Sequence, residues 1–251
     1  MTRGLLRTNF HSSHLIRCLA ELDLSKDVDP ASDFADELGQ WMHFTDAIAF
    51  SSVLESGLAK HASQSPALRT TTGARLTAEF ERVRAFMANA IIKSCAPSGG
   101  KSAIALPLPV DLEVTYAPYR RFYEAQQRDM ELSVEPLRVN LREALAKASP
   151  RLRKLAELDA IMDKFLRERE ARLLARVPML LQKRFDTHHA AHQDQLAASG
   201  QVDNPATWMQ PGGWLARFCS ELQTLLLAEA ELRLQPSAGL LKAFNQQETH
   251  D

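Results

Sequence analysis

The sequence predicts an all-α protein, built as a bundle of long amphipathic helices with no substantial sheet. Apolar residues recur at spacings of three and four through most of the 251 residues, which is the period of a helix buried on one face. Proline and glycine gather in a few stretches that separate these periodic segments. The best strand candidate, VDLEV at 110–114, is short. A hydrophobic content of 45% is enough for one large domain or two small ones.

Three helices are expected in the amino-terminal half. The first covers about 13–24, where leucine and isoleucine side chains share one face. The second follows Ser32, a residue type favoured at the N-cap position. The third covers about 74–95. Together these helices predict an N-terminal helical bundle over 13–95.

A Pro- and Gly-rich connector is expected at 96–116. It begins close to CAPSGGKS, whose ending resembles a phosphate-binding loop. Such a loop needs a glycine five residues before Gly100, and Cys95 occupies that position. A helical pattern precedes the motif, and Pro107 and Pro109 oppose a following helix. We therefore interpret this stretch as a helix end that leads into a connector, and not as a nucleotide site.

The region 117–246 is predicted to consist of long helices. Pro118 is well placed at the first position of a helix, and Pro136 is expected to interrupt that helix. Ser149 and Pro150 have the pattern of an N-cap followed by proline at the first helical position.

The helical pattern then continues from Pro150 to about Leu196, with Pro178 as an expected kink. An unbroken helix of this length would be about 70 Å long, so it should pair with another long helix. GQVDNPATWMQPGG is expected to form a loop, and 213–235 is again amphipathic. Residues 247–251 are expected to form a frayed tail.

Charge, cysteine content and hydropathy narrow the class of protein. The formal net charge of -1 favours neither nucleic acid nor an anionic membrane. The three cysteines are odd in number and far apart, which suits a reducing compartment. No stretch reaches the ~18 uninterrupted apolar residues of a membrane span, and the amino terminus lacks the apolar core of a secretory signal. A cytoplasmic location is therefore expected.

The stretch DTHHAAHQD contains the candidate metal ligands His188, His189 and His192. His188 and His192 are four residues apart, which is the spacing of two ligands on one helix. A zinc-protease helix would need glutamate at the position of His189, so that motif is absent. Further ligands could come from HSSH near the amino terminus, whereas a solvated helix end is the structural alternative. No cofactor is otherwise indicated.

Segment 151–184 has a local excess of basic residues and raises the hypothesis of a nucleic-acid-binding helix. Opposite charges recur four residues apart in it, for example at Asp163 and Arg167, which is typical of a solvent-exposed helix. Residues 21–55 carry nine acidic groups and one lysine. The two segments could attract each other, so nucleic-acid binding is the weaker interpretation.

The stretch TYAPYRRFY contains all three tyrosines of the chain. Tyrosine and arginine are favoured at protein interfaces because they combine a large contact area with directed donors. A partner-binding surface is therefore expected at four residues: Tyr116, Tyr119, Arg120 and Tyr123. The alternative is that the aromatic rings pack in the core, and the same two interpretations apply to Trp208 and Trp214.

Three stretches, DFADELGQWMHFTDAIAFSSVL, VTYAPYRRFYEAQQRDM and LRVNLREALAKASPRLRKLAELD, together with the length of the chain, resemble an uncharacterised bacterial family. That family is defined only as a domain of unknown function, so the resemblance implies no activity and no site residues. Its members tend to be encoded beside envelope proteins similar to motor-channel subunits and outer-membrane-anchoring domains. The resemblance thus implies a cytoplasmic role accessory to such a complex.

The leading hypothesis is a non-enzymatic helical interaction protein that binds a protein partner, with homo-oligomerisation as a further expectation. A metal-dependent helical protein that uses His188 and His192 is the second hypothesis. A nucleic-acid-binding protein that uses 151–184 is the third.

Overall fold

The computed structural model describes residues 14–21, 51–54, 66–95 and 114–246. These residues form helices and include no strand, which confirms the predicted all-α class. The labelled helices are α1 (His14–Glu21), α4 (Pro66–Ser94), α5 (Ala117–Ala148), α6 (Pro150–Leu174), α7 (Val177–Ser199), α8 (Pro205–Trp208) and α9 (Trp214–Gln246).

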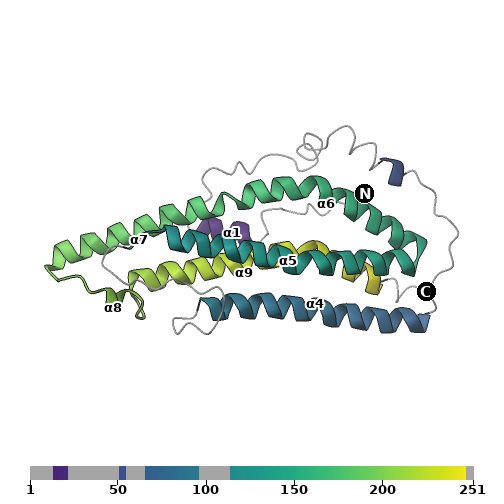
Figure 1. The fold of residues 1–251 in the computed structure, drawn as a ribbon, viewed down its shortest axis with the longest axis horizontal. Coiled ribbons are helices and arrows are strands. Elements are labelled where there is room, and N and C mark those ends of the chain that lie inside the picture. The colour runs from purple at the N-terminus through teal and green to yellow at the C-terminus, as the bar shows by residue number, and fades with distance from the viewer. Residues whose placement is uncertain (1–13, 22–50, 55–65, 96–113, 247–251) are drawn as a thin grey trace, which may run out of the picture.

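Long helices lie side by side along the long axis of the molecule, with α5 and α9 at its centre (Figure 1). Helix α4 packs against both of them, and α6 and α7 follow each other along the opposite side of the bundle. The short helix α1 packs against α9. The buried apolar residues form one cluster that extends from Leu15 of α1 to Phe244 of α9.

Helices from both halves of the sequence share this core, since α1 and α4 both pack on α9. The middle of the predicted N-terminal bundle and most of the connector lie outside the described residues, as does the tail at 247–251. The division into 13–95, 96–116 and 117–246 therefore stays a prediction. The strand candidate at 110–114 also falls outside them, except for Val114, which is not in a strand.

Two prolines lie inside helices. The prediction that Pro136 interrupts a helix was wrong, because α5 continues through it. Pro136 is exposed, so water can reach the Leu132 carbonyl that loses its helical donor there. Pro236 is the second proline inside a helix, and α9 continues through it. The predicted cap before α6 is present, since the Ser149 hydroxyl accepts a hydrogen bond from the Leu152 N–H at 3.3 Å.

Helices α6 and α7 are separated at Ala175 and Arg176, just before Pro178, where the sequence predicted a kink. Proline has no N–H to donate to the carbonyl of Leu174, four residues earlier. The side-chain amide of Gln127, from α5, donates to that carbonyl at 3.3 Å instead. The Tyr116 hydroxyl donates to the Pro178 carbonyl at 2.5 Å. Gln127 therefore replaces the hydrogen bond that proline removes, and Tyr116 adds a second contact between α5 and the first turn of α7.

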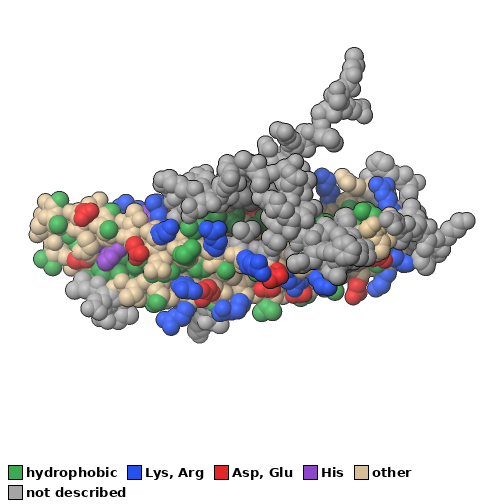
Figure 2. Space-filling model, turned by 90° about the horizontal axis from the view of Figure 1, so that it is seen from above, with side chains coloured by type: hydrophobic (Ala, Val, Ile, Leu, Met, Phe, Trp, Pro, Cys, Tyr) green, Lys and Arg blue, Asp and Glu red, His purple; other side chains and the backbone are tan. Residues whose placement is uncertain are grey.

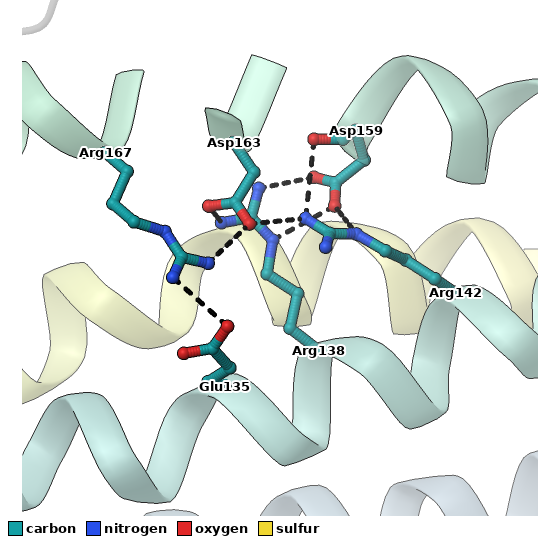
Figure 3. A network of polar contacts seen from close by, with 6 residues as sticks. All are labelled: Glu135, Arg138, Arg142, Asp159, Asp163 and Arg167. Atoms are coloured by element: carbon teal, nitrogen blue, oxygen red, sulfur yellow. Dashed lines mark hydrogen bonds and ion pairs between the residues drawn. The ribbon is translucent and has the colours of Figure 1, made fainter. Parts of the chain in front are cut away.

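A network of ion pairs holds α6 against α5 (Figure 3). Arg138 of α5 contacts Asp159 and Asp163 of α6 at 2.7 Å each. Arg142 contacts the same two carboxylates at 2.6 and 2.9 Å. Arg167 joins Asp163 at 3.0 Å to Glu135 of α5 at 3.1 Å. Carboxylates and guanidinium groups from two helices thus neutralise one another in a half-buried position.

Asp163 is the most heavily paired carboxylate of this network, and its side chain is only 12% exposed. Burial alone would raise the pKa of Asp163. The hydrogen bonds from Arg142 and Arg167 and the charge of Arg138 outweigh burial and lower the pKa below 3.8. The stabilisation from the ionised form is therefore complete above pH ~4 and is lost as the pH falls further.

Asp163→Asn should lower the free energy of unfolding by about 2–3 kcal/mol at pH 7, because three guanidinium groups lose their shared counter-charge. Chemical denaturation at pH 7 and near pH 3 would measure this effect, and the difference from wild type should shrink at the lower pH. Asp129→Asn, at an exposed position of α5, is the matched control and should change stability little. Equal effects of both substitutions would contradict a stabilising role for the network.

Candidate functional site

The loop between α7 and α9 is fixed in place at one end of the bundle. Gly200 ends α7 with φ of 65°, a left-handed conformation that favours glycine. Asn204 caps α8 by accepting a hydrogen bond from the Ala206 N–H at 3.1 Å. A Cβ atom on Gly213 would lie 2.2 Å from the Trp208 carbonyl oxygen, so only glycine fits there. The loop therefore returns the chain tightly to the start of α9.

Aromatic rings from α7, α8 and α9 pack together beneath this loop. Trp208 and Trp214 are both buried, with ring centroids 5.5 Å apart. Phe185 of α7 meets Trp214 edge to face at 5.4 Å and Phe218 at 5.2 Å. Edge-to-face and tilted arrangements at these distances are favourable for aromatic pairs. The two tryptophans are therefore core residues, and both also line the pocket described below.

Each of the two histidines on one face of α7 contacts its own carboxylate. His188 Nε2 lies 3.0 Å from Glu221 of α9, which also accepts two hydrogen bonds from Arg184. His192 Nε2 lies 2.9 Å from Asp203 of the loop. These two histidines therefore join α7 to the loop and to α9.

The remaining histidine and the carboxylate of the loop make further contacts in the same cluster. Asp203 also accepts a hydrogen bond from the indole N–H of Trp208 at 2.7 Å. The ring of His189 packs against Trp214 at 5.1 Å. The candidate metal ligands are thus all used in holding this end of the bundle together.

The electrostatics of both carboxylates follow from these contacts. Burial alone would raise the pKa of Asp203, but the hydrogen bonds from Trp208 and His192 outweigh it and lower the pKa below 3.8. Burial likewise opposes ionisation of Glu221, and Arg184 and His188 lower its pKa below 4.5. Both groups are therefore carboxylates at neutral pH.

No group of three or more histidine, cysteine, aspartate and glutamate side chains comes together as a metal site within the described ranges. His188, His189 and His192 lie in one cluster, but with separate partners. Of the HSSH motif, His14 is described, and it contacts Glu231 at 3.0 Å. The metal-site hypothesis thus gains no additional ligand from the described residues.

A pocket of about 320 Å³ opens between α7, the loop and the start of α9. Histidine and glutamine side chains of α7 form one wall, and the first turn of α9 forms another. Its lining includes His188, Ala191, His192, Gln195, Thr207, Trp208, Trp214 and Arg217. The amino end of a long helix carries partial positive charge, and Arg217 adds a full one. The pocket is therefore suited to polar or acidic groups of a binding partner.

Sequence patterns pointed to the histidines and tryptophans of this site, but not to Asp203, Glu221 or Arg217. The run Asp203–Asn204–Pro205 is a turn signal within the expected loop, but it does not indicate which side chains Asp203 contacts. Glu221 and Arg217 are ordinary residues of an amphipathic helix in the sequence. Their positions beside the pocket follow from the packing of α9 on α7.

The three tyrosines of the predicted partner surface lie inside the bundle. Tyr116, Tyr119 and Tyr123 are 7%, 1% and 0% exposed, and burial raises the pKa of each phenol. The Tyr123 hydroxyl donates to buried Glu229 at 2.9 Å. Arg120 is exposed and contacts a neighbouring glutamate of α5. The rings therefore pack in the core, as the alternative interpretation had it, and only Arg120 lies at the surface.

The basic segment 151–184 contributes charges to both described clusters. Arg167 belongs to the ion-pair network of α5 and α6, and Arg184 contacts Glu221. Basic side chains are scattered among acidic and apolar ones on the face shown in Figure 2.

In the described part of the chain, no helix is long and apolar enough to cross a membrane.

The fold and the site define an elongated all-α protein with a polar pocket at one end of its helical bundle. The family model described as "Protein of unknown function (DUF3348)" matches residues 1–246, so the chain belongs to this family. This match confirms the resemblance to a family of unknown function. Neither the curated proteins nor the solved structures contain a match to the chain.

Asp203→Ala should loosen the loop, because the indole of Trp208 and the imidazole of His192 both lose their acceptor. We expect a loss of about 1–3 kcal/mol in the free energy of unfolding and a change in near-ultraviolet circular dichroism from the tryptophan pair. Asp194→Ala, at an exposed position of α7, is the control. An unchanged aromatic signal in the Asp203 variant would show that this carboxylate does not hold the tryptophans.

Proposed function

We propose that the protein is a non-enzymatic helical interaction protein that binds a protein partner at the pocket between α7 and α9. The observation that carries this proposal is the pocket itself, which is built on two long helices and a loop fixed by Asp203. Interface hot spots form where a partner's side chain enters a rigid, partly desolvated pocket. Its lining combines tryptophan, histidine and arginine with glutamine side chains.

The surroundings of the pocket support the same proposal. Val202 is 93% exposed on the loop next to Asp203, which places an apolar side chain at this end of the bundle. His188 and His192 are engaged by carboxylates on one side, so their positions are fixed before a partner arrives. Fixed side chains lose less entropy on binding than mobile ones.

The proposal includes the place where the protein acts. The thiols of Cys95 and Cys219 are buried, and burial raises the pKa of each to about 12, which suits cysteines kept as thiols in a reducing cytoplasm. We propose a cytoplasmic accessory role to an envelope-associated complex, in line with the gene neighbourhood that the family resemblance implies. The partner would then be a cytoplasmic segment of that complex.

Ala191→Trp tests the pocket, because Ala191 lines it from an exposed position of α7 and makes no polar side-chain contact. Tagged wild-type and variant proteins would be purified from the native host, and the co-purifying proteins quantified by mass spectrometry. We expect the partner to be reduced by about tenfold or more with Ala191→Trp. Purified partner would then be titrated against both proteins by calorimetry.

The matched control is Ala190→Trp, which adds the same indole one residue away, outside the pocket lining. It should retain the partner, and thermal melting should show that both variants fold. Identical partner sets and affinities for the wild type and both variants would refute the pocket as the binding site.

A further inference from the structure

The outer face of α5 is self-complementary, and we propose that it pairs with the same face of a second copy in an antiparallel, two-fold symmetric dimer. This inference goes beyond the proposed function and does not depend on the pocket. It rests on the order of apolar and charged side chains along one stripe of α5, which is exposed except at Glu124, a half-buried residue that contacts Arg120 at 2.8 Å. Members of the stripe are spaced three or four residues apart: Glu124, Arg128, Leu132, Glu135, Val139, Glu143 and Lys147.

The apolar members of the stripe lie near its centre. Leu132 is 72% exposed and Val139 is 41% exposed, although both are large apolar side chains. They lie equally far on either side of the junction between Glu135 and Pro136. A two-fold axis through that junction would therefore place Leu132 of one copy opposite Val139 of the other. Such an isologous contact forms twice in each dimer.

The charged members of the stripe obey the same symmetry with opposite signs. Arg128 and Glu143 lie equally far from the junction, and so do Glu124 and Lys147. The axis would thus bring each basic side chain to an acidic one of the second copy. Within one chain, Glu143 and Lys147 are exposed and 3.7 Å apart, which is a weak surface pair. Both can turn to a partner at little cost.

The residues closest to the axis are also compatible with this pairing. Two copies of Glu135 would approach each other there, but each already contacts Arg167 at 3.1 Å. The intrachain arginine therefore offsets the repulsion between the two carboxylates. Pro136 is exposed beside it and presents no charge. The charge pattern favours a second copy of this chain as the partner. In an antiparallel pair, each charge of the stripe faces the opposite charge of the same stripe in the other copy.

Helix α4 adds an apolar side chain beside the stripe. The contact from Asn140 of α5 to Glu79 of α4, at 2.8 Å, fixes the register of these antiparallel helices. Seven residues further along α4 and seven residues back along α5, Phe86 lies level with Ser133, next to Leu132. Phe86 is 65% exposed. The two-fold axis would bring α4 of both copies to the same side, so Phe86 extends the apolar centre of the contact.

Charge reversal tests the antiparallel pairing. Sedimentation of the full chain over a range of protein concentrations should show a reversible dimer. Arg128→Glu should weaken it by about tenfold or more, because two like-charge contacts with Glu143 replace two attractive ones. The double variant Arg128→Glu with Glu143→Arg should restore dimerisation. Lys183→Glu, an exposed charge reversal on α7, should leave the dimer unchanged.

Site-specific cross-linking fixes the register. A chain with Leu132→Cys should cross-link to a differently tagged chain with Val139→Cys, faster than either variant cross-links to itself. Two copies of residue 132 would be about 10 Å apart along the helices. The native cysteines are buried and should not compete. A monomer at every concentration, failure of the double variant to restore the dimer, or preferred cross-linking of residue 132 to itself would each overturn the proposal. None of these results depends on the pocket or its partner.

Discussion

The buried carboxylate of Glu229 is the constraint around which the bundle is arranged. Its side chain is 0% exposed, and an ionised carboxylate in that position would cost several kcal/mol without partners. Arg233 contacts it at 2.8 Å, Tyr123 donates at 2.9 Å and Gln127 donates at 3.0 Å. The partners come from α5 and α9, so these helices must pack in one register to satisfy the charge. Gln127 also reaches the end of α6, which extends the same constraint to a third helix.

The two ends of the bundle differ because α6 and α7 pack on different helices. Where α6 ends, the break at Pro178 lets α7 run along α9, and the aromatic and histidine cluster forms between them. On the other side of the break, α6 packs mainly on α5 and little on α9, so polar groups reach the contact between α5 and α6. The ion-pair network of Arg138, Arg142, Asp159 and Asp163 occupies that contact (Figure 3). The apolar core extends through both ends, and it is supplemented by the aromatic cluster at one end and by the ion pairs between α5 and α6 at the other.

Local patterns in the sequence predicted the helices but not their long-range partners. The period of apolar residues sufficed for the all-α class, and Ser149 before Pro150 sufficed for the cap of α6. Pro136 and Pro178 look alike in sequence, yet only Pro178 separates two helices, and the side chain that replaces its hydrogen bond is Gln127 on another helix. The stretch TYAPYRRFY likewise has the composition of an interface, yet its tyrosines are buried. Their partners are distant in sequence: Tyr123 donates to Glu229, 106 residues away. Tyr116 and Tyr119 pack on Phe185 and Phe218.

The pocket and the stripe of α5 lie on different parts of the molecule, and pairing through the stripe would determine where the two pockets of a dimer lie. Helix α5 begins near the end of the bundle that carries the pocket, since Tyr116 packs on Phe185 of α7 at 5.8 Å. Antiparallel pairing of α5 would therefore place the two pockets at opposite ends of the dimer. A dimer of this kind would bridge two partner segments, and the second contact would form at the high effective concentration set by the first. Loss of the dimer would then weaken attachment to a repeated partner while each pocket kept its own affinity.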